Sequence, residues 1–250
     1  MITTELPLSI VDAIVVRALE EDLGAGDITT EACVSEEQRA IAEGVAREEL
    51  VACGLPVAAR VFLTLDPTLC FTPKVPEGST VKAGGVLFTV EGRARAILTA
   101  ERVALNLLQR MTGIASTTRR YVDALPEGSR TRITDTRKTT PGLRLLDRYS
   151  VRRGGGHNHR NDLGSAVLIK DNHIVAAGGV REAIASARAR APHTSKIECE
   201  VDTLEQLADA LAAGADIVLL DNMETETVRE AVRVTRGRAL LEASGGITLS

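Results

Sequence analysis

The feature that most constrains the fold is a regular alternation of short apolar segments and amphipathic segments in the second half of the chain. From Lys196 onward it repeats about every 21 residues, with strand-length pieces followed by helical pieces of about 10 residues. We expect strands at 132–136, 166–170, 197–201, 217–220 and 239–242, and helices at 180–190, 204–213 and 225–235. Such a series predicts an α/β fold with a parallel sheet, either an open doubly wound sheet or a β/α barrel.

The first 115 residues follow a different pattern and indicate a separate domain, with residues 116–250 forming the second. Apolar periodicity predicts helices at 8–22 and 99–114, the latter with Thr99 as its N-cap, and strand-like pieces at 40–47, 50–53, 71–73 and 86–90. Residues 76–85 resemble the turns of a biotinyl or lipoyl carrier domain, but no lysine sits at a hairpin tip, so we interpret them as part of a small β layer. Arg102 lies opposite the apolar face of the second helix and faces either solvent or a partner.

Composition excludes several classes of function. A pI near 5.7 and an aromatic content of 2% argue against nucleic-acid binding, which uses basic surfaces and aromatic stacking. No apolar run reaches the length of a membrane span, and the four cysteines lack metal-binding or redox spacing. We therefore expect a cytoplasmic protein with reduced thiols, without a membrane or nucleic-acid partner.

Positive charge is concentrated between residues 130 and 160, although the chain as a whole has a formal charge of −4. This window ends in a Gly-Gly-Gly-His-Asn-His-Arg string at 154–160, whose glycines either let the backbone approach a ligand or form a turn. A transition metal at His157 and His159 would need a third ligand, which no familiar spacing supplies. The sequence leaves open whether four further arginines shape the field around a ligand or are surface charges: Arg144, Arg148, Arg152 and Arg153.

Polar residues follow each expected strand, where the active sites of β/α barrels are built. Arg137, Lys138, Arg160 and Lys170 could bind carboxylates or phosphates there. Lys170 could instead be a Schiff-base lysine, but its polar surroundings favour ion binding.

Two acids are directed at the same rim. Glu200 and Asp221 could hold sugar hydroxyls, stabilise a cationic sugar carbon or position Mg²⁺, or could simply pair with the nearby cations. Ser244, Gly245 and Gly246 offer backbone N–H groups for a phosphate. Together these groups suit a phosphorylated sugar and a second, acidic molecule.

These strings, taken together, resemble the quinolinate phosphoribosyltransferase family. The matching pieces are Glu-Asp-Leu-Gly-Ala-Gly-Asp at 21–27, Thr-Ala-Glu-Arg at 99–102, Asp-Thr-Arg-Lys-Thr at 135–139, the string at 154–160, Ile-Lys-Asp-Asn-His at 169–173, Glu-Val-Asp at 200–202, Leu-Asp-Asn at 220–222 and Glu-Ala-Ser-Gly-Gly at 242–246. They occur in the family's order and cover nearly the whole chain.

The resemblance implies an N-terminal α/β sandwich followed by an incomplete, open TIM-like α/β barrel. It implies a pentosyltransferase that joins quinolinate to 5-phosphoribosyl-1-pyrophosphate and releases nicotinate mononucleotide, pyrophosphate and CO₂, a step of NAD biosynthesis. Mg²⁺ would enter with the pyrophosphate substrate, near Glu200 and Asp221. The chain would form a homodimer, or a higher oligomer, in which Arg102 enters the neighbouring subunit's site.

The resemblance also assigns roles along the rim. Arg137, Arg160 and Lys170 would bind the quinolinate carboxylates, with Thr136 and His159 beside them. Lys138 would meet the pyrophosphate substrate, and Ser244, Gly245 and Gly246 would face its 5-phosphate. The residues closest to the chemistry would be Lys138, Lys170, Glu200 and Asp221.

Family chains continue beyond the Ser-Gly-Gly strand with a further helix, strand and tail, whereas this sequence stops at Ser250. We therefore expect a chain that lacks the segment closing the barrel. Two alternatives stay open: a related phosphoribosyltransferase with another acidic acceptor, and a shortened, non-catalytic binding protein.

Overall fold

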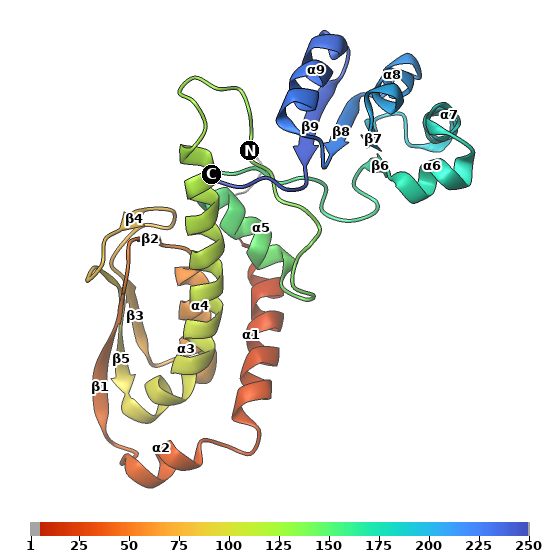
Figure 1. Cartoon of the computed structure of the whole chain (residues 1–250). Helices are drawn as coiled ribbons and strands as arrows, with labels where there is room; N and C mark the ends of the chain where they lie inside the picture. Colours follow the sequence, from red (N-terminus) through yellow and green to blue (C-terminus); the bar gives the residue numbers. More distant parts are fainter. Residues whose placement is uncertain (1–5, 250) are drawn as a thin grey trace. The chain divides into compact units, whose positions relative to one another are not determined.

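A computed structural model of the chain describes residues 6–249, and it divides into two compact units, 1–159 and 160–250. Figure 1 shows a mixed α/β architecture, which confirms the expected fold class. No helix within residues 6–249 is long and apolar enough to cross a membrane. Each unit has a hydrophobic core of its own.

The first unit contains an antiparallel sheet with strand order β1-β5-β3. These strands span Arg39–Val45, Val86–Arg93 and Cys70–Pro73, and a second small sheet pairs β2 (Leu50–Val51) with β4 (Thr80–Val81). All three phenylalanines of the chain meet beside this sheet, with the rings of Phe71 and Phe88 stacked 4.8 Å apart and Phe62 about 6 Å from both. The expected β layer is confirmed, and residues 76–85 are part of it.

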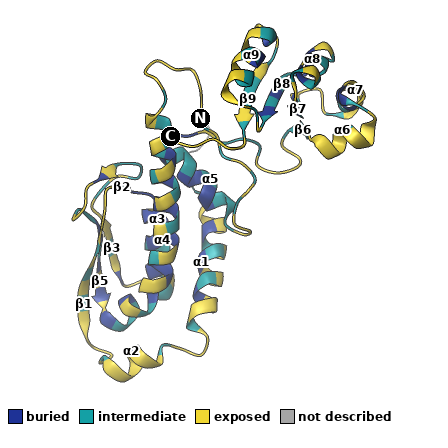
Figure 2. Ribbon diagram, viewed as in Figure 1, coloured by how far each residue is buried: buried dark blue, intermediate teal, exposed yellow. Residues whose placement is uncertain are grey.

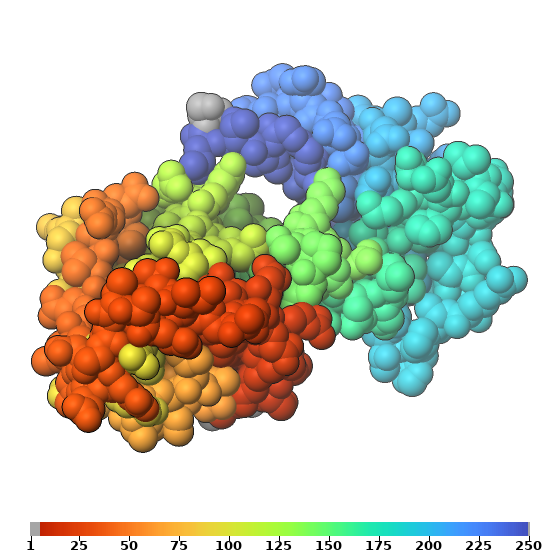
Figure 3. All heavy atoms as spheres, turned by 90° about the horizontal axis from the view of Figure 1, so that it is seen from below, coloured from red at the N-terminus to blue at the C-terminus, as the bar shows by residue number. Residues whose placement is uncertain are grey.

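The helices that accompany these strands within residues 6–159 are α1 (Leu8–Leu23), α2 (Ile28–Cys33), α3 (Leu55–Leu65), α4 (Ala94–Asp123) and α5 (Arg144–Arg153). The apolar face of α4 is buried in the core, as Figure 2 shows by its dark blue stripe. The space-filling view in Figure 3 shows α1 and the segment after it, in red and orange, as a continuous part of the first unit's surface. The expected helix at 8–22 is confirmed, whereas the one at 99–114 is much longer.

Thr99 does not cap α4, because the helix begins five residues earlier with Arg93 at its N-cap. The Thr99 hydroxyl instead donates to the carboxylate of Asp27, at 3.0 Å. The other oxygen of Asp27 accepts from the backbone N–H of Thr30 and so caps α2. The capping side chain in this region is therefore Asp27, which caps α2, and not Thr99 at the start of α4.

Glu77 joins α3 to α5 through its carboxylate. It accepts from the backbone N–H groups of Gly54 and Leu55, at 3.0 and 2.7 Å, where α3 begins. It also accepts from the hydroxyl of Tyr149 on α5, at 2.8 Å. Burial, and then the neighbouring negative charge, raise the pKa of Tyr149 far above its ordinary value, so the phenol stays a donor. An anionic side chain at a helix N-terminus also interacts favourably with the helix dipole.

The glycines that follow α5 serve the packing of α5 against α4. A Cβ at Gly154 would overlap the side chain of Thr118 and the carbonyl of Ala115, and one at Gly156 would overlap Thr118 again. Gly155 has a φ of +95°, which side-chain-bearing residues rarely adopt. The structure therefore favours the interpretation of this run as a turn that packs closely on α4.

The second unit is a parallel sheet with strand order β6-β7-β8-β9. The strands span Val167–Ile169, Ile197–Val201, Ile217–Asp221 and Leu240–Ser244. The helices between and around them are α6 (Asp171–Ala177), α7 (Val180–Arg190), α8 (Leu204–Ala212) and α9 (Thr225–Thr235). These bounds confirm the expected βα series to within a few residues at each end.

One face of this sheet packs against the helices of its own unit. Cys199, Val201, Val218 and Leu220 lie in one apolar cluster with buried side chains of α7, α8 and α9. Because side chains alternate along a strand, Glu200 and its register neighbours belong to the opposite face. This face, which we call the open face of the sheet, carries most of the polar residues singled out in the sequence.

The expected strand at 132–136 is absent, and this expectation was wrong. Thr134 makes a single isolated parallel bridge with His157, supported by the bonds of Asp135 N–H to the carbonyl of His157 and of His157 N–H to the carbonyl of Ile133. Polar and apolar residues do alternate at 132–136, as in a strand, but within the described residues this segment forms only the one bridge. A strand needs several consecutive ladder bonds, and here side-chain hydrogen bonds hold the segment instead.

Candidate active site

The segment 135–140 of the first unit places Arg137 and Lys138 at the tip of a hydrogen-bonded turn. Lys138 N–H donates to the hydroxyl of Thr136 at 3.0 Å, and Thr139 N–H donates to the carbonyl of Arg137 at 3.0 Å. Lys138 is exposed. Nε of Arg137 is buried and, among residues 6–249, has no hydrogen-bond partner. A guanidinium with an unused buried donor is suited to an anionic ligand.

His159 closes the first unit, and its backbone is fixed by this turn. Its N–H donates to the carboxylate of Asp135 at 2.7 Å. The side chain of Asn158 also donates to Asp135, at 2.6 Å. The two basic strings of the sequence, at 135–139 and 154–160, are therefore joined at Asp135.

Arg102 lies in a second place within the first unit. It lines a hollow of about 360 Å³ together with Asp22, Gly26, Asp27 and Thr99. The hollow thus brings together the two N-terminal strings at 21–27 and 99–102, which are more than 70 residues apart in the sequence. Arg102 is exposed, as its position on the polar face of α4 predicts.

In the second unit, Lys170 and Glu200 lie at neighbouring strand ends and form an ion pair. Lys170 follows β6, and its Nζ donates to Oε2 of Glu200 on β7 at 3.2 Å. The side chain of Lys170 is 46% exposed and that of Glu200 is 15% exposed. An ammonium bound to a carboxylate is not the neutral amine that a Schiff base requires, which favours ion binding by Lys170.

His173 on α6 supports the backbone at this point, because its Nδ1 accepts from the N–H of Lys170 at 2.9 Å. Arg160, the first residue of the second unit, donates to the carbonyl of Ala166 at 3.2 Å. Both contacts lie within the segment that leads into and out of β6.

Asp221 and Ser244 end the next two strands and are direct register partners. The backbone after them turns sharply: Asn222 has a φ of +50° and its N–H donates to the carbonyl of Ser244 at 2.8 Å. Gly245 has a φ of +84°, and a Cβ there would overlap the side chain of Asn222. Glycine is therefore required at position 245 for the ends of β8 and β9 to meet. This structural requirement is independent of any ligand that Gly245 and Gly246 bind.

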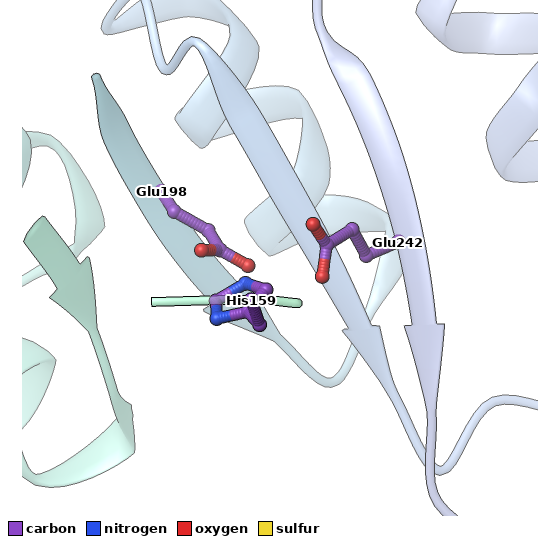
Figure 4. Close-up of side chains that lie close together, drawn as sticks. All are labelled: His159, Glu198 and Glu242. Atoms are coloured by element: carbon purple, nitrogen blue, oxygen red, sulfur yellow. The ribbon is translucent and has the colours of Figure 1, made fainter. Parts of the chain in front are cut away.

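The structure reveals two further carboxylates on the open face, for which the sequence strings suggested no role. Glu198 on β7 and Glu242 on β9 point toward one another across β8 (Figure 4), with carboxylate oxygens within 4.8 Å. Glu198 is 3% exposed. The signal in the sequence was the i, i+2 spacing of Glu198 and Glu200, which places both on one face of a strand.

The open face therefore carries an acidic group on three successive strands. Lys170 faces Glu200 at its edge, and Ser244 lies beside Asp221 at the carboxyl ends. Sugar hydroxyls and hydrated divalent cations are the ligands that such a set of oxygens binds best.

Comparison with protein families decides the relationship. The model of the quinolinate phosphoribosyl transferase N-terminal domain matches residues 27–112, and that of the C-terminal domain matches residues 114–250. The chain belongs to the quinolinate phosphoribosyltransferase family. The resemblance inferred from the sequence strings is thereby confirmed.

Members of this family with curated names are closely similar to the chain. It is 44% identical to the probable nicotinate-nucleotide pyrophosphorylase [carboxylating] of Synechocystis, over 98% of this chain and 83% of that protein. It is 45% identical to the corresponding Mycobacterium leprae enzyme, over 93% of this chain and 84% of that one. The solved NadC of Streptococcus pyogenes is 42% identical, with a TM-score of 0.93 over 99% of this chain and 87% of that one.

Proposed function

We propose that this chain transfers the phosphoribosyl group of 5-phosphoribosyl-1-pyrophosphate to quinolinate and releases CO₂, giving nicotinate mononucleotide and pyrophosphate. The observation that carries the proposal is the match of both domains of the family, in order, across residues 27–250. Relatives at 44–45% identity are named for the carboxylating pyrophosphorylase reaction. The chain is thus proposed as a pentosyltransferase of NAD biosynthesis that acts in the cytoplasm.

For the acidic acceptor, we assign Arg137, Arg160 and Lys170 to the two carboxylates of quinolinate, with Thr136 and His159 beside them. The buried, unused Nε of Arg137 supports this assignment. So does the exposed ammonium of Lys170, which Glu200 holds without covering it. Guanidinium groups bind carboxylates in a bidentate manner, which would orient the pyridine ring.

For the phosphoribosyl donor, we assign Lys138 to the pyrophosphate and Ser244, Gly245 and Gly246 to the 5-phosphate. Glu200 and Asp221 would hold the ribose hydroxyls or the Mg²⁺ that accompanies the substrate. The carboxylates fit such an ion, since among residues 6–249 Lys170 donates to one oxygen of Glu200 and Asn222 donates to one oxygen of Asp221, which leaves the second oxygen of each carboxylate for a ligand. When bound, Mg²⁺ would neutralise charge on the departing pyrophosphate.

The proposed chemistry needs positioning and electrostatics more than a strong base. As the pyrophosphate leaves, C1 of the ribose becomes oxocarbenium-like, and the ring nitrogen of quinolinate forms the new bond. The carboxylate next to that nitrogen then leaves as CO₂, and its ring carbon takes up a proton. Carboxylates near C1 and cations near the leaving group stabilise the charges that develop in this sequence.

We also propose a homodimer in which Arg102 is donated to the partner's site. Its exposure on α4 and its place in the hollow with the 21–27 string support an intermolecular role. Mixing inactive Arg102→Ala with inactive Lys170→Ala should restore activity in hybrid dimers, which contain one intact site. Confirmed subunit exchange without any recovery would count against a shared site.

The test of the activity uses purified protein, Mg²⁺, phosphoribosyl pyrophosphate and quinolinate labelled with ¹³C in the 2-carboxylate. We expect labelled CO₂ and nicotinate mononucleotide in equal amounts. Replacing quinolinate by nicotinate tests a relative with another acceptor, and we expect no product from it. Folded protein that gives no product at saturating substrates would refute the proposed function.

A further inference from the structure

The buried carboxylate of Asp135 connects three segments of the first unit. It accepts from the N–H of His159 at 2.7 Å and from the side chain of Asn158 at 2.6 Å. Nη1 of Arg148, on α5, lies 3.3 Å from the same carboxylate and donates to the carbonyl of His159 at 3.0 Å. Asn158 in turn donates to the backbone carbonyl of Arg148 at 2.9 Å. We call Asp135, Arg148 and Asn158 the Asp135 clamp.

The clamp is shielded from water, with only 6% of the Asp135 side chain and 15% of the Arg148 side chain exposed. Burial raises the pKa of Asp135, and the bonds from His159, Arg148 and Asn158 act in the opposite direction. A buried carboxylate beside an anion-binding segment repels anions, so it is unsuited to binding the substrate itself. Its use must be in organising the donors around it.

A second set of contacts fixes the other end of the turn. Nε of Arg144, one helical turn before Arg148 on α5, donates to the hydroxyl of Thr139 at 3.1 Å. The N–H of Thr140 lies 3.3 Å from the carboxylate of Asp147. Asp147 is held by Arg110 of α4 through two bonds of 2.7 and 2.8 Å. The segment that carries Arg137 and Lys138 is therefore tied down on both sides.

We propose that Asp135 is a positioning residue, which through the clamp sets the relative placement of the Arg137–Lys138 turn and His159 for binding of the dicarboxylate acceptor. The proposal rests on the proposed function, and Asp135 itself touches no substrate. It also assigns Arg144 and Arg148 a use that their sequence leaves open. Their guanidinium groups hold the segment through Thr139, Asp135 and the carbonyl of His159, and do not contact the ligand.

The decisive variant is Asp135→Asn, which keeps the size of the side chain but removes its charge and presents an amide to the donors of Asn158 and His159. We expect the Kd of quinolinate, measured by titration calorimetry, to rise at least tenfold, and that of phosphoribosyl pyrophosphate to rise less. Hydrogen exchange of the peptide containing His159 should become faster. Arg148→Lys keeps the charge but replaces the guanidinium by a single ammonium nitrogen. It should raise the Kd of quinolinate by less than Asp135→Asn does.

The matched control is Asp66→Asn. It removes the charge of another buried carboxylate of the same unit, Asp66, which pairs with the half-exposed Arg93 and, among residues 6–249, has no hydrogen bond to the basic strings. This variant should lose stability without changing the Kd of quinolinate by more than twofold. A merely structural role for Asp135 would make the two variants alike.

The proposal is overturned if Asp135→Asn binds quinolinate within twofold of the wild type, or if exchange at His159 is unchanged. Failure of the proposed function has a different signature: the wild type itself then neither binds nor converts quinolinate. In that case the exchange experiment still decides whether Asp135 holds the His159 segment.

Discussion

Removal of the Glu77 carboxylate should destabilise the first unit more than loss of a single hydrogen bond. In Glu77→Ala, the N–H groups of Gly54 and Leu55 and the hydroxyl of Tyr149 lose their acceptor. Leaving a buried donor unsatisfied costs about 1–3 kcal/mol. Because Glu77 is itself only half-buried, water will replace part of the loss, and we expect a decrease of about 2–4 kcal/mol in the free energy of unfolding.

For a unit of this size, each kcal/mol corresponds to about 2–4 °C, so the melting temperature should fall by about 10 °C. Glu77→Gln, which keeps one acceptor, should lose roughly half as much. Tyr149→Phe removes one bond to a carboxylate acceptor and should lose about 1.5–3 kcal/mol. Urea titrations followed by circular dichroism would measure all three variants.

Two controls test the role assigned to the Glu77 carboxylate. Glu127→Ala removes an exposed carboxylate after α4 and should change the free energy of unfolding by less than about 0.5 kcal/mol. Glu77→Ala and Tyr149→Phe should be non-additive by at least about 0.5 kcal/mol, because both variants remove the same hydrogen bond. A Glu77→Ala protein with the same melting temperature as the wild type would contradict the assigned role of the carboxylate.

Three further outcomes are expected. Arg93 and the hydroxyl of Thr68 hold the pKa of Asp66 well below its ordinary value, so its stabilisation is present above about pH 4 and is lost as the pH falls; Asp66→Asn should flatten the acid limb of a stability–pH curve. Ellman's reagent at pH 8 should modify the exposed Cys33 and Cys70 in the folded protein but not Cys53, since burial raises the pKa of Cys53 to about 12. Gly156→Ala should lower the melting temperature by several degrees, because the added Cβ meets α4.

The elements that could be predicted from the sequence are those whose signal is local. The helix at 180–190 and the strand at 197–201 have an apolar face or run of their own, and the structure reproduces both ranges. In contrast, α5 was missed because its ten residues include four arginines and bury Asp147 and Ser150 among apolar neighbours. Periodicity of apolar residues does not reveal a helix whose packing face is partly polar.

The candidate site was predictable to the extent that its residues follow strands or form compact strings. The pairing of Lys170 with Glu200 follows from two strand ends meeting at one sheet edge, but the sequence alone does not distinguish this ion pair from ligand binding by Glu200. The partners of Asp135 could not be foreseen. Arg148 and Asn158 are 13 and 23 residues away, and only the turn of α5 and the close packing of its following glycines bring them to the carboxylate.

The length of α4 gives the first unit a mechanical property. Its 30 residues form a continuous rod of about 45 Å. Arg102 and Arg110 stand on this rod about 12 Å apart along the axis, so neither can shift along it without the other. Arg110 donates to the carboxylate of Asp147, and this carboxylate accepts from the N–H of Thr140 at the end of the 135–140 turn. The position of any group that Arg102 binds is therefore fixed, through the rigid helix α4, relative to the turn that carries Arg137 and Lys138.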